Sequence, residues 1–237
     1  MSLPSGPPSF LLVHGSWLRP TCWVPLQQAL TERGLRSRTV ALPSVGPQRT
    51  PTAGMYDDAD AITAEIRRTP RPIVVVAHSY AGIPVTQAAV GRSGVAHIVY
   101  LAAYVPAEGE SLNSMHGQNA HAPGEEEDLT GTTPAIFDDP RASLFGDVPD
   151  ALARQTVDML VEQSLRAYQQ PVTRAAWRTV PSTYLLCTQD QALPPTRQEQ
   201  MSVRTSRVER LGTHHCPFLS APVELAAVLD KIASAGH

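Results

Sequence analysis

One stretch of the chain constrains its fold more than any other, because it joins a buried strand, a serine and a helix without interruption. Residues 73–77 are apolar and mostly β-branched, which is typical of a strand buried on both faces. After Ser79, residues 83–90 predict a helix with Pro84 in its first turn, where a missing N–H costs little. A serine at such a corner, with small residues at 77, 81 and 82, is typical of a nucleophile elbow. A chance serine in an alanine-rich chain is the alternative, and the flanking strand and helix argue against it.

Apolar strands alternate with amphipathic helices along most of the sequence. We expect strands at 9–13, 38–42, 73–77, 95–102, 183–187 and 206–211, and helices at 23–33, 56–68, 83–90, 197–204 and 222–234. Regular alternation predicts an α/β fold with a mostly parallel central sheet flanked by helices on both faces. A length of 237 residues suits a single domain.

The alternation breaks between Val105 and Val180. Residues 113–150 are rich in Gly, Pro, Asn and acidic residues, whereas 151–169 predict one helix and 172–179 a further short one. The first half is too poorly apolar to hold a core of its own. We therefore expect residues 113–180 to form a helical cap or lid, inserted before the last two strands into a core made of 1–112 and 181–237.

Charge, cysteine content and the N-terminus argue against several classes of protein. A net charge of −3 gives no basic surface for nucleic acid or an anionic membrane, and no segment is long enough to span a bilayer. No basic region precedes an apolar stretch at the N-terminus, so we expect no signal peptide and a cytoplasmic protein. We also expect neither metal nor cofactor, since no glycine-rich phosphate loop follows a strand and neither the cysteines nor the remaining histidines cluster: Cys22, Cys187, Cys216, His97, His116, His121. The oligomeric state stays open.

Two further residues complete a candidate catalytic set with Ser79. A nucleophilic serine needs a base within reach and a carboxylate that orients the base. Asp190 follows the strand at 183–187 and a histidine pair follows the last strand, so all three groups lie at carboxyl ends of strands, in the order serine, aspartate, histidine. We expect His215 to be the base, with His214 as the alternative. Glu108 is the competing acid.

Acyl transfer at Ser79 also requires donors for the oxyanion. The backbone N–H of Tyr80 is one candidate, and the N–H of Ser16, in the loop after the first strand, is the other, with Trp17 as its alternative. In the same loop we expect Gly15 to permit a tight turn and His14 to hold the backbone in place.

Aromatic residues near these motifs predict either a substrate pocket or plain core. The candidates are Trp17, Trp23, Tyr104 and Phe218. We expect His78, which points away from its neighbour Ser79, to serve in packing.

Taken together, these motifs resemble the α/β-hydrolase superfamily, and within it the small bacterial carboxylesterases related to plant methylesterases and hydroxynitrile lyases. The resemblance is carried by residues 13–17 with Trp23, 77–82, 101–106, 188–190 and His215. It implies a Ser79–His215–Asp190 triad, cofactor-free chemistry and a small, largely apolar pocket under the cap. Lyases of that branch carry a threonine at the position of Gly15 and a lysine at that of Cys216, so the resemblance does not extend to lyase activity.

The expected activity is hydrolysis of carboxylic esters of small, apolar or aromatic substrates through an acyl-enzyme. One alternative keeps the same site but opens lactones, cyclises or otherwise tailors a biosynthetic intermediate, since one fold hosts many chemistries. Another is a ligand-binding protein without catalysis, which has no need of a complete triad. In each case the expected partner is a small molecule, an ester or a lactone for the two enzymes.

Overall fold

Six parallel strands form a central sheet in the computed structural model, which describes residues 7–46, 52–117 and 131–234. Their order across the sheet is β2-β1-β3-β4-β7-β8, and every neighbouring pair is parallel. The strands are β1 Ser9–Val13, β2 Arg36–Val40, β3 Ile73–His78, β4 Val95–Leu101, β7 Ser182–Cys187 and β8 Arg207–Leu211. The parallel sheet predicted from the alternation of apolar segments is confirmed, with β2 two residues earlier than expected.

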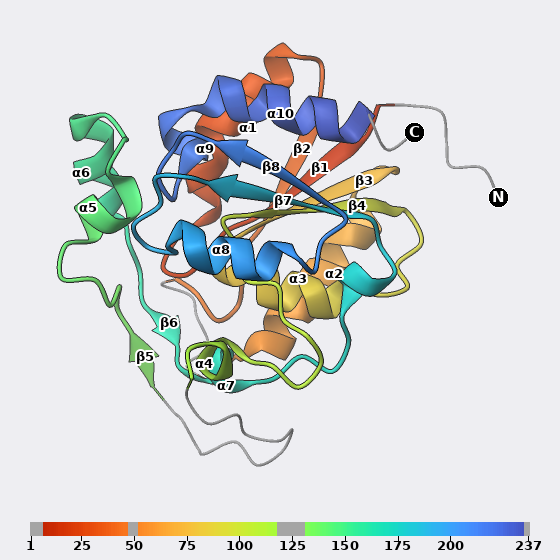
Figure 1. Cartoon of the computed structure of the whole chain (residues 1–237), viewed down its shortest axis with the longest axis horizontal. Helices are drawn as coiled ribbons and strands as arrows, with labels where there is room; N and C mark the ends of the chain where they lie inside the picture. Colours follow the sequence, from red (N-terminus) through yellow and green to blue (C-terminus); the bar gives the residue numbers. More distant parts are fainter. Residues whose placement is uncertain (1–6, 47–51, 118–130, 235–237) are drawn as a thin grey trace.

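Helices cover both faces of this sheet (Figure 1). Phe10 and Leu12 of β1 belong to the core beneath α1 and α10, whereas Leu11 and Val13 belong to the core on the side of α2 and α3. Because successive side chains of a strand alternate between faces, burial on both faces explains the continuous apolar runs. The flanking helices are α1 Val24–Glu32, α2 Met55–Arg68, α3 Gly82–Ala88, α8 Pro195–Ser202, α9 Pro217–Ser220 and α10 Pro222–Ser234.

The strand order reverses at the centre of the sheet. From β1 the chain moves outward to β2 and then returns to place β3 on the other side of β1, with Val13 of β1 in register with Ala77 of β3. In open parallel sheets, ligands bind beyond the carboxyl ends of the strands at such a reversal. The loops after β1 and β3 meet there, and they carry Ser16 and Ser79.

The insertion between β4 and β7 is only partly helical. It contains α4 Leu112–Met115, β5 Thr132–Thr133, α5 Pro140–Phe145, α6 Asp150–Asp158, β6 Gln163–Ser164, α7 Arg166–Gln169 and the 3₁₀ turn η3 Ala176–Arg178. The short strands β5 and β6 pair in antiparallel fashion. Residues 118–130 of the predicted cap, and residues 1–6 of the N-terminus, lie outside the described residues.

The prediction of a single helix over residues 151–169 of this insertion is wrong. Helix α6 ends at Asp158, and the backbone that follows bonds to the core instead of to itself: Val161 N–H donates to Trp17 O at 2.9 Å, and Ser164 N–H donates to Ser44 O at 2.8 Å. These long-range bonds replace the helical ones, so tertiary contacts override local periodicity. The helix predicted over 172–179 shrinks to η3.

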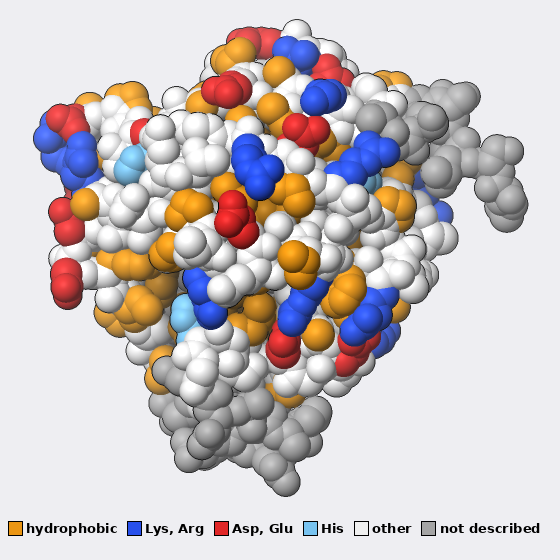
Figure 2. All heavy atoms as spheres, viewed as in Figure 1, with side chains coloured by type: hydrophobic (Ala, Val, Ile, Leu, Met, Phe, Trp, Pro, Cys, Tyr) orange, Lys and Arg blue, Asp and Glu red, His pale blue; other side chains and the backbone are white. Residues whose placement is uncertain are grey.

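Charges of both signs lie on the face of the molecule that Figure 2 presents. Figure 2 shows acidic and basic side chains interspersed over one face rather than gathered by sign. Across the described ranges, every helix is too short or too polar to traverse a lipid bilayer.

Candidate active site

Ser79 lies at the point where β3 turns into a helix, in a backbone conformation that few residues adopt. Its φ is +55°, and the only other non-glycine residues with positive φ in the described chain are Trp17 at +60° and Ala102 at +42°. Each of the three follows a strand, β1, β3 or β4, at the carboxyl edge of the sheet. Such conformations cost about 1–3 kcal/mol each and cluster at functional sites. The three strained residues therefore follow three adjacent strands, β1, β3 and β4, at one edge of the sheet.

Close packing explains why small residues surround this corner. A Cβ on Gly15 would lie 2.8 Å from Cβ of Ser79, and one on Gly82 would overlap the carbonyl oxygen of Tyr104. Gly15 does not have a positive φ, so its requirement is space beside Ser79 rather than the tight turn that we predicted. His14 holds the same loop: its Nδ1 lies 3.0 Å from Gly15 O, and Leu42 N–H donates to its Nε2 at 3.4 Å.

His215 and Asp190 form a buried pair at the neighbouring strand ends. Nδ1 of His215 lies 2.7 Å from Oδ2 of Asp190, and both side chains are almost fully buried. The loops that carry them are joined by backbone bonds, since Thr188 N–H donates to Leu211 O at 2.8 Å and Gln189 N–H donates to Thr213 O. With Nδ1–H donated to the carboxylate, the free nitrogen of His215 is Nε2, as a general base requires.

The Asp190 carboxylate is held by further donors. Oδ1 accepts from the backbone N–H groups of Ala192 at 2.8 Å and Leu193 at 2.9 Å, and Oδ2 accepts from Nε2 of Gln198 at 3.0 Å. The Gln198 side chain also bonds both backbone groups of Cys187. Gln198 thus orients the acid from α8. The sequence gives no signal for it, because it is one polar residue among several on a polar helix.

His78 supports the loop that presents His215. Burial and the neighbouring His215 hold the pKa of His78 well below its usual range, so its ring is neutral. Its Nε2 lies 2.9 Å from the carbonyl oxygen of His215, which only accepts, so Nε2 carries the proton. The ring also packs against His215 and Phe218. The packing role expected of His78 therefore includes a hydrogen bond to the histidine loop.

Tyr80 and Ser16, whose backbone N–H groups are the candidate oxyanion donors, lie in the segments that follow β3 and β1. Tyr80 is the second residue of the 3₁₀ turn η2 Ser79–Ala81, which leads into α3, and N–H groups in a first helical turn have no partner within the helix. Ser16 lies in the loop after β1 and lines the same cavity as Ser79. The Trp17 side chain is anchored to the insertion through Nε1, which donates to Thr133 O at 3.2 Å.

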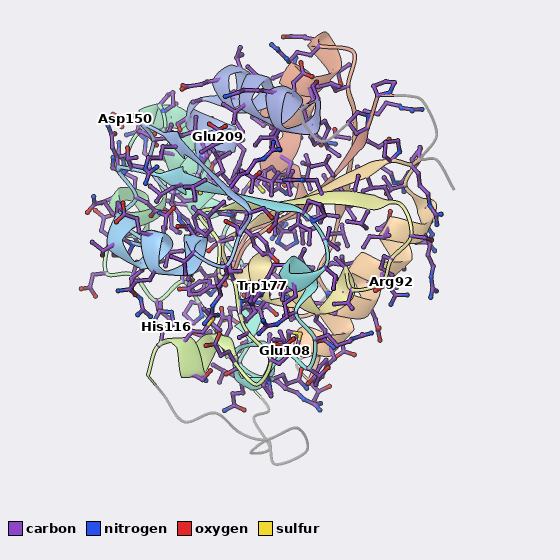
Figure 3. All side chains as sticks on the ribbon, turned by 45° about the vertical axis from the view of Figure 1, so that its right-hand side comes forward. Arg92, Glu108, His116, Asp150, Trp177 and Glu209 are labelled. Atoms are coloured by element: carbon purple, nitrogen blue, oxygen red, sulfur yellow. The ribbon has the colours of Figure 1, made fainter. Side chains whose placement is uncertain are left out.

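A cavity of about 410 Å³ opens above Ser79 and His215. None of the Asp, Glu, Lys or Arg residues that the structure describes lines it. Its walls combine aromatic and aliphatic side chains with a few polar ones, and they are formed by Ser16, Trp17, Leu18, His78, Ser79, Tyr104, Leu112, Asn113, His116, Ile136, Phe137, Leu144, Tyr168, Ala192, Leu193 and His215. The hydroxyl of Tyr104 lies 2.7 Å from Nε2 of His116, which follows α4 (Figure 3). This cavity fits a small, neutral, largely apolar ligand.

The structure separates the alternatives left open by the sequence. Glu108 is exposed and paired with Arg178, near Trp177 (Figure 3), whereas Asp190 contacts the histidine. The backbone N–H of His214 donates to Asp147, and its Nδ1 has no hydrogen-bond partner among the described residues. Within the described chain, Glu108 and His214 therefore do not join the candidate site.

Phe218 and Trp23 pack behind the cavity instead of lining it. Their ring centroids are 4.4 Å apart, and both side chains are fully buried. The prediction that Phe218 lines the pocket is therefore wrong. Its side chain, on α9, is buried in the core, where it contacts His78. Trp17 and Tyr104 do line the cavity.

The described histidine, cysteine and acidic side chains do not form a metal-binding cluster at this site. Groups of three or more that could hold a metal ion are absent from residues 7–46, 52–117 and 131–234. The three cysteines are free and buried.

The chain is similar to known hydrolases over nearly its whole length. Residues 10–228 match the family model described as the alpha/beta hydrolase family. "Probable hydrolase R7" of Phoma sp. is 30% identical over 95% of this chain and 98% of its own. Methyl jasmonate esterase 1 of Vitis vinifera is 24% identical over 94% of this chain and 95% of its own. The crystal structure of the methylesterase MES16 from Arabidopsis superposes with a TM-score of 0.79 at 22% identity, covering 96% of this chain and 99% of that one.

Proposed function

The chain belongs to the alpha/beta hydrolase family, and on that premise we propose that it is a serine esterase acting on small, neutral, apolar or aromatic carboxylic esters. The observation that carries the proposal is the 2.7 Å contact between His215 Nδ1 and Asp190 Oδ2, made beside a cavity that His215 shares with Ser79. A serine, an oriented histidine and a space for a ligand are the parts that acyl transfer needs. Esterases among the relatives support the choice of reaction.

Acylation begins when Ser79 Oγ attacks the ester carbonyl carbon. Nε2 of His215 takes the hydroxyl proton, and the Asp190 carboxylate stabilises the imidazolium that forms. The carbonyl oxygen becomes an oxyanion, which the N–H groups of Tyr80 and Ser16 stabilise. The intermediate then collapses, the bond to the alkoxide breaks, and His215 returns the proton to the departing alcohol.

Deacylation repeats these steps with water. His215 takes a proton from a water molecule, whose oxygen attacks the acyl-enzyme carbonyl, and the same two N–H groups hold the second oxyanion. Collapse breaks the bond to Ser79, whose Oγ recovers its proton from His215. The products are one carboxylic acid and one alcohol, with one water consumed.

The walls of the cavity favour neutral substrates. A substrate carboxylate or ammonium would lose its hydration without meeting an opposite charge, because the described lining has no charged side chain. Trp17 and Phe137 meet edge to face, with ring centroids 5.8 Å apart, and provide an aromatic wall. The Tyr104–His116 pair supplies polar atoms that can orient an ester oxygen.

Methanol trapping tests this mechanism directly. Two esters that share an acyl group but differ in their alcohol are hydrolysed at fixed methanol concentration, and the ratio of methyl ester to acid is measured. A common acyl-enzyme predicts the same ratio from both esters, and Ser79→Ala should abolish both products. A ratio that depends on the leaving alcohol, or full turnover by Ser79→Ala, would refute an acyl-enzyme on Ser79.

A further inference from the structure

A buried carboxylate, Asp58 of α2, binds the side chain of the residue that follows the candidate nucleophile. The hydroxyl of Tyr80 donates to Asp58 Oδ2 at 2.7 Å, and both residues are buried. Ser44, in the loop after β2, donates to the same carboxylate twice: through its hydroxyl to Oδ2 at 2.6 Å and through its backbone N–H to Oδ1 at 3.0 Å. Asp58 therefore connects the elbow to the loop after β2, and the proposed mechanism assigns it no role.

The same carboxylate connects to the loop after β1 through the insertion. Nε2 of Gln163 in β6 donates to Ser44 Oγ at 3.1 Å, and the hydroxyl of Tyr168 in α7 donates to Gln163 Oε1 at 2.9 Å. The Tyr168 hydroxyl also lies 3.2 Å from Oγ of Ser16. The rings of Tyr80 and Tyr168 also meet edge to face, with centroids 5.7 Å apart, so the two tyrosines contact each other directly as well.

The two ends of this network are Tyr80 and Ser16, the residues whose N–H groups the proposed function uses for the oxyanion. We propose that Asp58 is a positioning residue for ester hydrolysis: its carboxylate sets the spacing of the two loops that present these N–H groups, and the inference rests on the proposed function. The insertion takes part, because Gln163 and Tyr168 provide the bridge between the loops.

The chemistry of the network requires an acceptor at position 58. Three donors, two from Ser44 and one from Tyr80, converge on the two oxygens of Asp58. A carboxylate accepts all three, whereas an asparagine offers one oxygen and one NH₂ group. In either orientation the NH₂ group would face a donor, so hydroxyls must reverse or the loops must move.

The charges around Asp58 fit this role. Burial raises the pKa of Asp58 to about 6, the donors from Ser44 and Tyr80 oppose that rise, and the nearby Asp57 adds to it. Tyr80 stays protonated, because burial and the Asp58 charge raise its pKa well above the usual value. Burial likewise raises the pKa of Tyr168. At neutral pH the hydroxyls are therefore donors and Asp58 is the anionic acceptor.

The test measures kcat and KM for p-nitrophenyl acetate in Asp58→Asn and Tyr80→Phe. A fluorophosphonate titration of each preparation counts the active sites, so that loss of folded enzyme is not read as loss of rate. Asp60→Asn makes the same change at an exposed position of α2, and Tyr100→Phe removes a buried hydroxyl that bonds Thr86 in the core. Both controls should keep kcat within about twofold.

We expect Asp58→Asn to lower kcat per titrated site about 10- to 100-fold with KM within about threefold, since loss of a whole oxyanion donor costs about 10²–10³. Tyr80→Phe, which keeps the Asp58–Ser44 bonds, should lower kcat about 5- to 20-fold, and it decides the question if Asp58→Asn does not fold. A kcat within twofold of wild type in Tyr80→Phe, or a change confined to KM, would overturn the inference while leaving the esterase intact. A wild type inert to both ester and fluorophosphonate would overturn the proposed function and this inference with it.

Discussion

At the scale of single residues, the environment of Ser79 is set by the space left for it. The serine has a positive φ, and Gly15 approaches it so closely that a Cβ there would also lie 2.9 Å from Nδ1 of His78. Neither neighbour can retreat, because His78 is bonded to the His215 loop and Ser79 begins the helix. Because Gly15 has no side chain, the loop after β1 can pack directly against the candidate nucleophile.

Replacing Gly15 with alanine tests this contact. The added methyl must push Ser79 or His78 away, so we expect kcat/KM for a small ester to fall at least 10-fold and the protein to lose about 1–3 kcal/mol of stability. Gly212→Ala is the matched control, since a Cβ there meets no atom within 4 Å. Steady-state kinetics and urea unfolding measure the two effects. Wild-type kinetics in Gly15→Ala would contradict the packing argument.

The choice of acid gives a second test at this scale. Asp190→Asn removes the charge that stabilises the His215 imidazolium and permits the wrong tautomer, so we expect kcat to fall about 10³- to 10⁴-fold, as in other serine triads. Glu108→Gln alters only an exposed pair with Arg178 and should leave kcat within about twofold. Ester kinetics on the two variants decide between the acids, and the reverse pattern would return Glu108 to the site.

At the scale of elements, what the sequence predicts depends on where each element finds its hydrogen bonds. All six strands of the sheet match the predicted segments within about two residues. The four inner strands β1, β3, β4 and β7 are apolar and largely buried, which makes them easy to find, whereas the edge strands β2 and β8 are largely exposed. The second half of the 151–169 segment was not predicted correctly, because Val161 and Ser164 bond to loops more than a hundred residues away in the chain. No local pattern contains those partners.

Some residues of the candidate site could likewise be predicted from the sequence, and others could not. Ser79, Asp190 and His215 each follow a strand of the parallel sheet, so the chain order and the fold together predict that they lie close to one another. Gln198 and Asp58 are buried polar residues of α8 and α2, and only the folded chain reveals that they contact Asp190 and Tyr80. Phe218 was assigned to the pocket on residue type alone, and the direction of α9 decides otherwise.

The insertion should determine which esters fit. Phe137, between β5 and α5, lines the cavity and packs edge to face on Trp17. Phe137→Ala removes half of this aromatic wall, so we expect the preference for methyl phenylacetate over methyl acetate, as a ratio of kcat/KM, to fall about 10-fold. Val203→Ala, at an exposed position directly after α8, is the control. An unchanged ratio would show that the acyl group lies elsewhere.

At the scale of the whole molecule, Asp58 links stability to pH. Its pKa rises from 3.8 in the unfolded chain to about 6 in the folded one, chiefly through burial. Between these values the native state binds a proton that the unfolded state does not, so the free energy of unfolding increases as the pH falls through this window. Ionisation of Asp58 therefore lowers the free energy of unfolding at neutral pH. A purely structural role would not explain an ionised carboxylate at this buried position.

Comparison with Asp58→Asn isolates this effect, because the other titrating groups are shared. Asp57, Tyr80 and Tyr168 are titratable groups that interact with Asp58 in the part of the chain that the structure describes, and all three remain in the variant. We expect wild type to gain about 2 kcal/mol over the variant on going from pH 7.5 to 4.5. Urea unfolding at both pH values measures the difference. A constant difference would mean that Asp58 titrates alike in the folded and unfolded states.

Catalysis as proposed depends on Ser79 being an activated nucleophile. Intact-mass spectrometry after treatment with a fluorophosphonate tests this activation without a guess at the substrate. Wild type and Ser79→Ala are compared, with folding of both confirmed by circular dichroism. We predict one adduct on wild type, mapped to Ser79, and none on the variant. A folded wild type that forms no adduct, or a variant that is labelled as fast as wild type, would contradict the assignment of Ser79.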